Sequence, residues 1–397
     1  MKNLIFLSNY YPSNLINKYK TDSKSSLDFA AHNLNVSLRE GFLLNGVSYY
    51  EINHPNIGNY PLYYKKKYIE ECIYDSGYSV AFNNLAFFKR FSILQSIERK
   101  LEEVISQMKE PPTVLLYNFD FLPRVGDIKN KYPQVKFVLL ITDIPEYMDV
   151  NNSIITRINR LIRNFAHNHF NRQIENYIDG FILLAPRMVE KIPINEKPWI
   201  QIEGIYNDED DSIQVEKSNT KQIVYTGNLG YRYGIRELLE AFSLIKDDNY
   251  ELIFRGSGEA EPEIREKEKN DSRIKLLPIL TKKELNILQK KATILINPVN
   301  PSQEFSKYFF PSKTLEYLAS GTPTLMGKLD CLPDDYLNYI YLIQDFTPYG
   351  LKQRIVEICS KPDSELSLFG SNASIFIHKN KTPQVQVKKI VDFISNL

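Results

Sequence analysis

Short apolar runs alternate with longer amphipathic segments along the chain. In its first half, apolar runs at residues 3–9, 47–53, 113–118 and 136–143 each end in polar side chains, and residues 88–108 have the spacing of a long amphipathic helix. Runs of about four to eight apolar residues between polar turns are typical of buried strands. Their alternation with helices predicts a parallel sheet that is covered by helices on both faces.

This pattern also places polar side chains at one edge of the predicted sheet. Asn9, Asn118, Asp120 and Asp143 each follow an apolar run closely. The carboxyl ends of parallel strands meet at one edge of a sheet, and ligands bind there. We therefore expect these four side chains to lie near a binding site.

A polar segment over residues 207–222 divides the chain and is typical of a linker; its acidic run 208–211 is interpreted as solvated charge. A second set of alternating strands and helices follows. Strands are predicted over 223–228, 250–258, 273–278 and 293–299, and helices over 235–245 and 281–292. Thr281 is placed to cap the second of these helices. The chain is therefore predicted to form two α/β domains, 1–205 and 206–381, followed by an amphipathic helix over 382–397.

The composition fits a globular protein and argues against several classes. Aromatic residues make up 12% of the sequence, which argues against a disordered chain. A formal net charge of +1 argues against a nucleic-acid binder. Cys72, Cys331 and Cys359 lie far apart in the sequence, which suits a reducing compartment and provides no metal-binding framework.

No segment has the length and hydrophobicity of a signal peptide or a membrane span. The first apolar run covers only residues 4–7, and no run approaches about 18 residues. We expect a cytoplasmic protein that can also lie on the inner face of the cell membrane. Residues 151–174 carry Arg157, Arg160 and Arg163 largely opposite an apolar helical face. Such a helix either binds an anionic membrane surface or packs on the first domain.

The segment KYFFPSKTLEYLASGTPTL, residues 307–325, predicts an anion site. Ser312 can cap a short helix here, which leaves the N–H groups of Lys313, Thr314 and Leu315 facing outward. Such a helix end attracts anions, and Lys313 adds a full positive charge. This pattern favours a phosphate or diphosphate, although an ordinary capped surface helix has the same residues.

Two further side chains of this segment suit a nucleotide. Glu316 lies one helical turn beyond Lys313, and its carboxylate can accept hydrogen bonds from two neighbouring hydroxyls, such as those of a ribose. Lys307 lies just before the predicted helix and adds a second positive charge.

Four phrases in the second half resemble the donor domain of family 4 glycosyltransferases, in the expected order. They are YTGNLGYRYGIRELLEAF at 225–242, LIFRGSGE at 252–259, the segment 274–298, and KYFFPSKTLEYLASGTPTL. The resemblance covers roughly residues 222–345, whereas the first half is similar in architecture alone. It implies the GT-B fold, in which two Rossmann-like domains face each other across a cleft and the C-terminal helix packs back on the first domain.

The resemblance implies a nucleotide-sugar site in the second domain. Gly227, Gly230 and Gly256 would lie in loops that approach the phosphates, because glycine admits close contact. Pro278 and Ile279 would lie in the loop that holds the nucleobase.

The same resemblance assigns roles to the helix at residues 312–316. Ser312, Lys313 and Thr314 would contact the diphosphate, and Glu316 would hold the donor ribose. No metal ion and no cofactor other than the donor itself is expected.

The sequence departs from the family pattern at three positions. Asn228 and Tyr233 stand where the family has a phosphate-binding arginine and lysine, and Tyr308 stands where it has an acidic residue. Arg232 and Lys307 are nearby cations that can substitute.

Asp143 is the catalytic candidate of the first domain, because it matches the second residue of a histidine–aspartate pair in the family. It either orients or deprotonates an acceptor hydroxyl, or it closes a loop. Asp120 is a second candidate of the same kind. His32 either faces the cleft or is structural, and it belongs to a helix predicted over 26–40 that ends at Gly41.

The predicted function is transfer of a hexosyl group from a UDP sugar to a hydroxyl of a glycan or lipid-linked glycan, in polysaccharide biosynthesis. By the resemblance, the anomeric configuration is retained. Two alternatives remain. One is a non-catalytic partner subunit that keeps the fold, which the departures favour, and the other is a sugar-nucleotide epimerase of the same fold.

Overall fold

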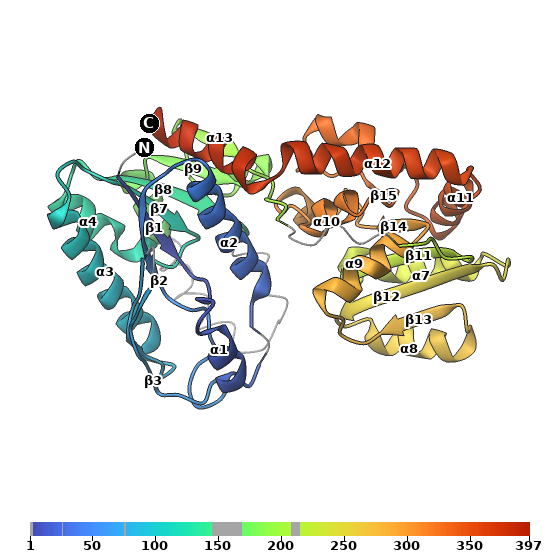
Figure 1. Cartoon of the computed structure of the whole chain (residues 1–397), viewed down its shortest axis with the longest axis horizontal. Coiled ribbons are helices and arrows are strands. Elements are labelled where there is room, and N and C mark those ends of the chain that lie inside the picture. The colour runs from blue at the N-terminus through green and yellow to red at the C-terminus, as the bar shows by residue number, and fades with distance from the viewer. Residues whose placement is uncertain (1–2, 26, 75–76, 145–168, 208–214) are drawn as a thin grey trace. The chain divides into compact units, whose positions relative to one another are not determined.

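The computed structural model describes residues 3–25, 27–74, 77–144, 169–207 and 215–397. The chain forms two compact units, unit 1 of residues 1–205 and 383–397 and unit 2 of residues 206–382. Each unit has its own parallel sheet and its own hydrophobic core (Figure 1). The predicted α/β fold class is confirmed.

An eight-stranded sheet forms the centre of unit 1. All its neighbouring strands are parallel except β4 and β5, so most carboxyl ends share one edge. In spatial order the strands are β10 (Trp199–Gln201), β9 (Gly180–Leu183), β8 (Lys136–Ile141), β7 (Thr113–Tyr117), β1 (Leu4–Ser8), β2 (Tyr49–Asn53), β5 (Gly77–Ser79) and β4 (Cys72–Tyr74).

Helices cover both faces of this sheet, with α3 (Lys89–Gln107) and α4 (Val125–Lys131) on one side and α2 (Phe29–Leu44) on the other (Figure 1). The C-terminal helix α13 (Pro383–Ser395) packs against α2. The core on that face includes Leu4, Phe6, Leu38, Phe42, Val387 and Ile390. Alternate residues of β1 point to opposite faces, as the period of a strand requires.

The prediction that the helix at 26–40 ends at Gly41 is wrong, because α2 continues to Leu44. Gly41 does not end the helix, and its lack of a side chain instead allows α13 to pack closely against α2. A Cβ atom at Gly41 would lie 2.2 Å from Cγ2 of Val387 on α13. The close approach of these two helices is a tertiary requirement, which the local sequence does not reveal.

The end of unit 1 that carries α1 (Ile16–Asp22) contains a small antiparallel pair, β3 (Tyr68–Ile69) and β6 (Phe82–Asn83). This pair was not predicted, because its strands are too short to show a period. Most of the predicted helix 151–174, including Arg157, Arg160 and Arg163, and the whole acidic run 208–211 lie outside the described residues.

Unit 2 contains a six-stranded sheet in which all neighbouring strands are parallel. In spatial order the strands are β13 (Ile274–Leu277), β12 (Tyr250–Ser257), β11 (Lys221–Asn228), β14 (Ile294–Asn297), β15 (Thr324–Gly327) and β16 (Tyr341–Ile343). The helices are α7 (Ile235–Ser243), α8 (Glu261–Asn270), α9 (Lys282–Lys291), α10 (Lys313–Ala319), α11 (Pro348–Cys359) and α12 (Asp363–Asn380).

Both faces of the unit 2 sheet are buried under helices. On one face Ile223 and Tyr225 of β11 share a core with Phe242 of α7. On the other face Val224 packs with Tyr317 of α10. Among the helices of the described ranges, none is long and apolar enough to be a candidate membrane span.

Candidate active site

Two glycine-containing loops pack against each other at the carboxyl edge of the unit 2 sheet. β11 and β12 run in parallel, and Gly227 pairs with Gly256. Gly256 has φ +156°, and a Cβ atom there would lie 1.7 Å from the carbonyl oxygen of Gly227. Gly227 itself has φ +128°. Only glycine fits at Gly256, and the close contact of the two backbones depends on it.

Much of the loop after β11 is closed by its own hydrogen bonds. The N–H of Leu229 donates to the carbonyl of Ser257 at 2.9 Å, and the N–H of Gly230 donates to Oδ1 of Asn228 at 2.8 Å. Asn228 therefore closes the loop through its side-chain oxygen. Since these amides are occupied, positive charge at this edge must come from side chains.

Lys313 supplies such a charge, directly over the glycine loop. Its Nζ lies 3.9 Å from the centre of the Tyr225 ring and would lie 3.6 Å from a Cβ atom at Gly227. Burial lowers the pKa of Lys313 to about 7, although the nearby Glu316 carboxylate opposes this shift. The structure therefore holds a desolvated ammonium group against the backbone that the sequence predicts to approach phosphates.

Arg232, two residues beyond Gly230, lies among aromatic rings. Its guanidinium is 5.0 Å from the ring centres of both Tyr233 and Phe305, and it donates to the Tyr233 hydroxyl at 2.9 Å. The ring of Tyr233 also lies 6.0 Å from Nζ of Lys313. The ring of Tyr233 is thus within about 6 Å of two cations.

The start of α10 differs from the prediction. Ser312 makes no side-chain cap hydrogen bond. The N–H of Thr314 donates to Pro311 at 2.8 Å and that of Leu315 to Ser312 at 3.1 Å. Thr314 is completely buried, with its hydroxyl toward the sulfur of Met326. The expected outward-facing N–H groups of Thr314 and Leu315 are therefore not available, because the first turn closes on itself.

The two carboxylates near the start of α10, Glu304 and Glu316, lie on different helical turns. Glu316 is exposed on α10, one turn beyond Lys313. Tyr308 is buried, and its hydroxyl donates to Oε1 of Glu304 at 2.9 Å, while Lys307 pairs with Oε2 of Glu304 at 2.8 Å. Lys307 therefore has a carboxylate partner within its own turn, which reduces its value as a phosphate ligand.

The loop after β13 presents an apolar side chain to solvent. Ile279 is 91% exposed and follows the exposed Pro278. Arg255, at the end of β12, donates to the carbonyl of Leu280 at 3.2 Å, and its buried Nε has no hydrogen-bond partner among the described residues. Sequence reasoning did not identify Arg255, although its position before the glycines of RGSG was a usable signal.

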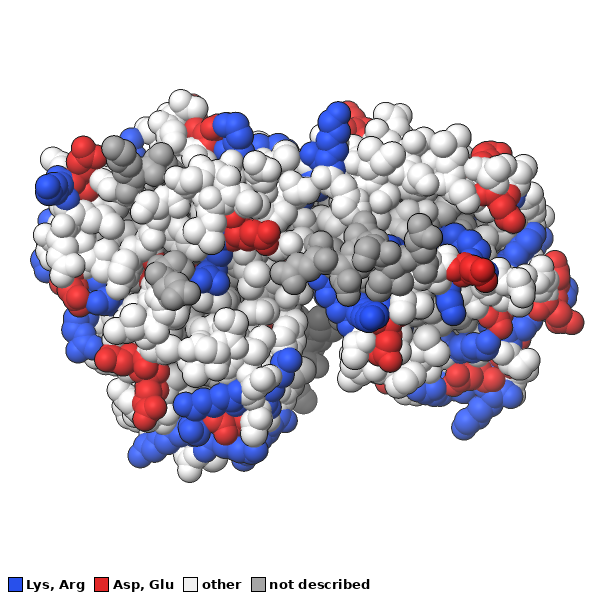
Figure 2. All heavy atoms as spheres, in the orientation of Figure 1, with Lys and Arg blue, Asp and Glu red and all other residues white. Residues whose placement is uncertain are grey.

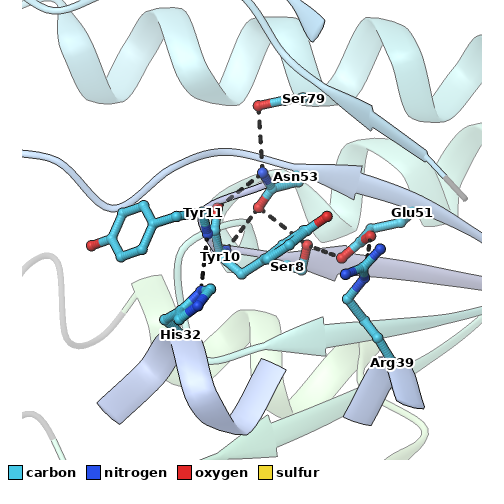
Figure 3. Close-up of polar contacts among 8 residues, drawn as sticks. All are labelled: Ser8, Tyr10, Tyr11, His32, Arg39, Glu51, Asn53 and Ser79. Carbon is cyan, nitrogen blue, oxygen red and sulfur yellow. Dashed lines mark hydrogen bonds and ion pairs between the residues drawn. The ribbon is translucent and has the colours of Figure 1, made fainter. Parts of the chain in front are cut away.

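In unit 1, the loop after β1 is held by a buried polar network (Figure 3). Ser8 donates to Glu51 at 2.6 Å, and Arg39 pairs with Glu51 at 2.9 Å. The side chain of Asn53 accepts from the N–H of Tyr10 and donates to its carbonyl. Burial raises the pKa of Glu51, and Arg39 and Ser8 oppose that shift.

His32 belongs to this network and not to an open surface. Its Nδ1 accepts a hydrogen bond from the N–H of Tyr11 at 3.3 Å, and its ring stacks on Tyr10 at 6.1 Å (Figure 3). Desolvation and the charges of Arg39 and Lys20 lower the pKa of His32. The structure therefore favours the structural role for His32, which fixes the loop conformation.

A histidine–aspartate pair lies at the carboxyl edge of the unit 1 sheet. Nε2 of His54, just after β2, lies 3.4 Å from Oδ2 of Asp120, after β7. Burial alone would raise the pKa of Asp120, but hydrogen bonds from His54 and Asn9 and the charge of Arg90 lower it on balance. Sequence reasoning found Asp120 and missed His54, because the two residues are far apart in the chain.

A small cavity lies against this pair. It has a volume of about 10 Å³, which is the size of one water molecule, and both His54 and Asp120 line it together with Ser8. Its remaining walls are the side chains of Leu7, Ile97, Leu116, Tyr117 and Phe121.

Asp143 lies at the same edge, after β8, and is exposed. Desolvation raises its pKa, and a hydrogen bond with Thr142 opposes the shift. Asn118 has φ +57° and accepts hydrogen bonds from both the N–H and the hydroxyl of Thr142 at 3.0 Å. The predicted clustering of polar side chains at this edge is therefore correct.

Residues 220–361 match the family model described as Glycosyl transferases group 1. Among solved structures, the chain is similar to sucrose-phosphate synthase from Thermosynechococcus elongatus, with a TM-score of 0.65, 14% identity, and 99% of this chain and 98% of that chain covered. The fold is that of the GT-B glycosyltransferases. The expected pair of Rossmann-like domains is thus confirmed as a fold class.

Two further similar structures contain UDP or a UDP sugar. The E. coli trehalose-6-phosphate protein bound with UDP-2-fluoro glucose matches with a TM-score of 0.64 and 9% identity, over 100% of this chain and 99% of that chain. Anabaena HepE in complex with UDP matches with a TM-score of 0.62 and 11% identity, over 100% of both chains. No curated protein sequence matches the chain. The family match is confined to residues 220–361, whereas the similarity of fold extends over the whole chain.

Proposed function

We propose that this GT-B protein is a family 4 glycosyltransferase that moves a hexosyl group from a UDP sugar to a hydroxyl of a glycan or lipid-linked glycan, with retention. The observation that carries the proposal is the position of Lys313 over the glycine loop of β11, within the residues that match the group 1 model. A cation fixed above a glycine backbone can stabilise the departing diphosphate.

The proposed donor contacts combine this geometry with the resemblance to family 4. Lys313 and Arg232 neutralise the diphosphate, and glycine at Gly227 lets it approach the backbone. Exposed Glu316 holds the ribose, and Ile279 covers one face of the nucleobase. UDP is favoured over other nucleotides because GT-B relatives of similar fold bind UDP or a UDP sugar.

The acceptor contacts belong to unit 1. Asp143 orients the acceptor hydroxyl or accepts its proton, in keeping with the resemblance to family 4. His54, backed by Asp120, is a second group at the same sheet edge that can accept a proton. Direct displacement by a deprotonated acceptor hydroxyl would invert the anomeric configuration, whichever of the two groups takes the proton. The configuration of the product therefore distinguishes direct displacement from retention, and separate substitution of Asp143 and His54 distinguishes the two groups.

A role in polysaccharide biosynthesis at the inner face of the membrane is part of the proposal. It rests on the resemblance and on the basic helix predicted over 151–174, which lies largely outside the described residues.

The test is an assay of nucleotide release and product formation with a panel of nucleotide sugars, with and without glycan and lipid extracts. Acceptor-dependent release of UDP, with a product of retained configuration, is the expected result. Lys313→Ala should abolish it, whereas Lys291→Ala, on the far end of α9, should not.

Other outcomes would replace the proposal. Interconversion of the donor sugar without transfer would establish an epimerase. Binding of nucleotide without either reaction would establish a partner subunit, as the departures at Asn228, Tyr233 and Tyr308 suggest.

A further inference from the structure

An exposed surface at one end of unit 1 combines aromatic and basic side chains. We call it the tip surface, and it comprises residues 16–25, 57–70 and 85–92. These segments are joined by hydrogen bonds, from the N–H of Lys24 to Tyr63 at 2.9 Å and from the N–H of Asn84, which immediately precedes the third segment, to Lys67 at 2.7 Å. The tip surface is therefore one continuous piece of the fold.

Three phenylalanines at the start of α3 project from the tip surface. Phe87 is 96% exposed, Phe88 60% and Phe91 56%. Removing an exposed phenyl group from water is energetically favourable. A cluster of such exposed groups therefore usually marks an interaction site. Leu62, Tyr63 and Tyr68 of the neighbouring segment are also exposed.

The charge of the tip surface is strongly positive. It carries seven exposed basic residues, Lys18, Lys20, Lys24, Lys65, Lys66, Lys67 and Arg90, together with the half-buried Lys89, and only two acidic residues, Asp22 and Glu70. Because the whole chain has a formal net charge of +1, the remainder of the chain is net negative. Figure 2 shows lysines and arginines gathered at the end of unit 1 where Figure 1 labels α1 and β3.

Few of these charges are neutralised by carboxylates. Nζ of Lys24 donates to the carbonyl of Pro61 at 2.7 Å, and Nζ of Lys65 donates to the carbonyl of Thr21 at 2.6 Å. These bonds hold the side chains in place without cancelling their charge. Lys66 pairs with Asp22 at 3.7 Å.

We propose that the tip surface binds an anionic lipid bilayer, with Phe87, Phe88 and Phe91 inserted at the headgroup boundary and the lysines against lipid phosphates. Phenyl groups without polar atoms insert into the interface, and each nearby lysine or arginine adds about 1 kcal/mol on an anionic surface. A nearly fully exposed projecting ring such as Phe87 suits insertion into lipid better than a flat contact with nucleic acid or an acidic protein.

The test is co-sedimentation of the full chain with vesicles of phosphatidylcholine, with and without phosphatidylglycerol, at low and high salt. We expect binding only to vesicles that contain phosphatidylglycerol, weakened by salt. Replacement of the three rings by Phe87→Ser, Phe88→Ser and Phe91→Ser should weaken binding by about tenfold or more. Lys66→Glu with Lys67→Glu should weaken it by about tenfold and reduce its salt dependence.

Matched controls lie in unit 2. Leu368→Ser with Ile375→Ser removes similarly exposed apolar side chains of α12, and Lys269→Glu with Lys291→Glu reverses two exposed charges. Both control variants should bind as the unaltered chain does. If the triple phenylalanine variant does not fold, Phe87→Ser alone replaces it, because that side chain contacts almost nothing.

Three results would overturn the proposal: no binding of the unaltered chain to anionic vesicles, equal loss in the unit 2 controls, or unchanged binding of the phenylalanine variants. Binding of heparin or RNA without binding of vesicles would identify a soluble polyanion instead. The assay contains no sugar nucleotide, so its outcome is independent of the proposed glycosyl transfer.

Discussion

At the scale of single residues, Lys313 lies where desolvation disfavours the charged form of its side chain. Lys313 is partly buried against Tyr225, and burial lowers its pKa to about 7. In the unfolded chain the same ammonium group has its ordinary pKa near 10.5. Folding therefore penalises the charged form, which is the form that binds a diphosphate.

The substitution Lys313→Met should separate these two effects. It should weaken UDP binding by about tenfold or more, because a charge-assisted contact contributes about 1.5–3 kcal/mol. It should also raise the free energy of unfolding at pH 7, by up to about 4 kcal/mol, because it removes the desolvated charge. Calorimetric titration with UDP and urea unfolding measure the two quantities.

The pH dependence of the stability gain has a defined sign. The penalty in the unaltered protein is complete below pH 7 and disappears as the pH rises from about 7 towards 10.5. The advantage of Lys313→Met should therefore shrink over that interval. The exposed Lys291→Met serves as the control, and an advantage that does not change with pH would contradict the assigned cause.

The His54–Asp120 pair gives a second prediction at this scale. If His54 accepts the acceptor proton, His54→Gln and Asp120→Asn should each lower kcat by about a hundredfold and leave KM for the donor unchanged. Because the pKa of Asp120 is lowered, Asp120 remains ionised and able to orient the imidazole at neutral pH. Steady-state kinetics of transfer provide the measurement.

The matched control for that pair is His378→Gln on α12, where the ring contacts the Ser374 carbonyl at 2.7 Å. It should leave kcat unchanged. An equal loss of activity in all three variants would indicate a general effect on folding.

At the scale of elements, the starts of α9 and α10 in unit 2 differ in how they are capped. Thr281 and Glu284 form a complete capping box at α9, as the sequence predicted for Thr281, whereas Ser312 makes no cap hydrogen bond at α10. The reason is backbone geometry, because Ser312 itself has helical φ and ψ of −51° and −34°. A residue in that conformation does not present its hydroxyl to the first-turn amides.

This difference predicts unequal costs for two similar substitutions. Thr281→Ala should lower the free energy of unfolding by about 1 kcal/mol. Ser312→Ala should change it by less than about 0.5 kcal/mol, as is usual at surface positions. Denaturant unfolding of unit 2 measures both, and a comparable loss in the two variants would show that Ser312 caps α10 in solution.

At the scale of the whole molecule, the chain order and the unit boundaries do not coincide. Unit 1 is completed by α13, which follows all of unit 2 in the sequence. Its side chains Val387, Ile390 and Ile394 belong to the core that contains Leu38 and Phe42 of α2. The stability of the first unit therefore depends on the last residues of the chain.

Ending the chain after residue 382 should expose that face of α2 and lower the melting temperature of unit 1, with little change in unit 2. Loss of several buried aliphatic side chains costs several kcal/mol, because each contributes about 1.5–3 kcal/mol. Calorimetry should show two transitions, of which UDP raises only that of unit 2. Equal destabilisation of both transitions would contradict the separation of the two cores.

Much of this architecture was readable from local patterns. The strands at 113–118, 223–228 and 293–299 appear nearly where predicted, because a buried parallel strand must be apolar throughout. The polar edge residues Asn118 and Asp143 were found for the same reason, since they end such runs. These features depend only on the order of residues along the chain.

Tertiary structure decided the remaining features. Gly41 lies inside α2 because α13 approaches it, His54 meets Asp120 from a different strand, and the first turn of α10 occupies the amides of Thr314 and Leu315. Each of these outcomes depends on residues distant in sequence or on the exact backbone angles at one turn. Hydrophobic periodicity carries no information about contacts between distant residues or about the backbone angles of one turn. Tertiary packing therefore determined which polar groups have partners within the protein and which are available to a ligand.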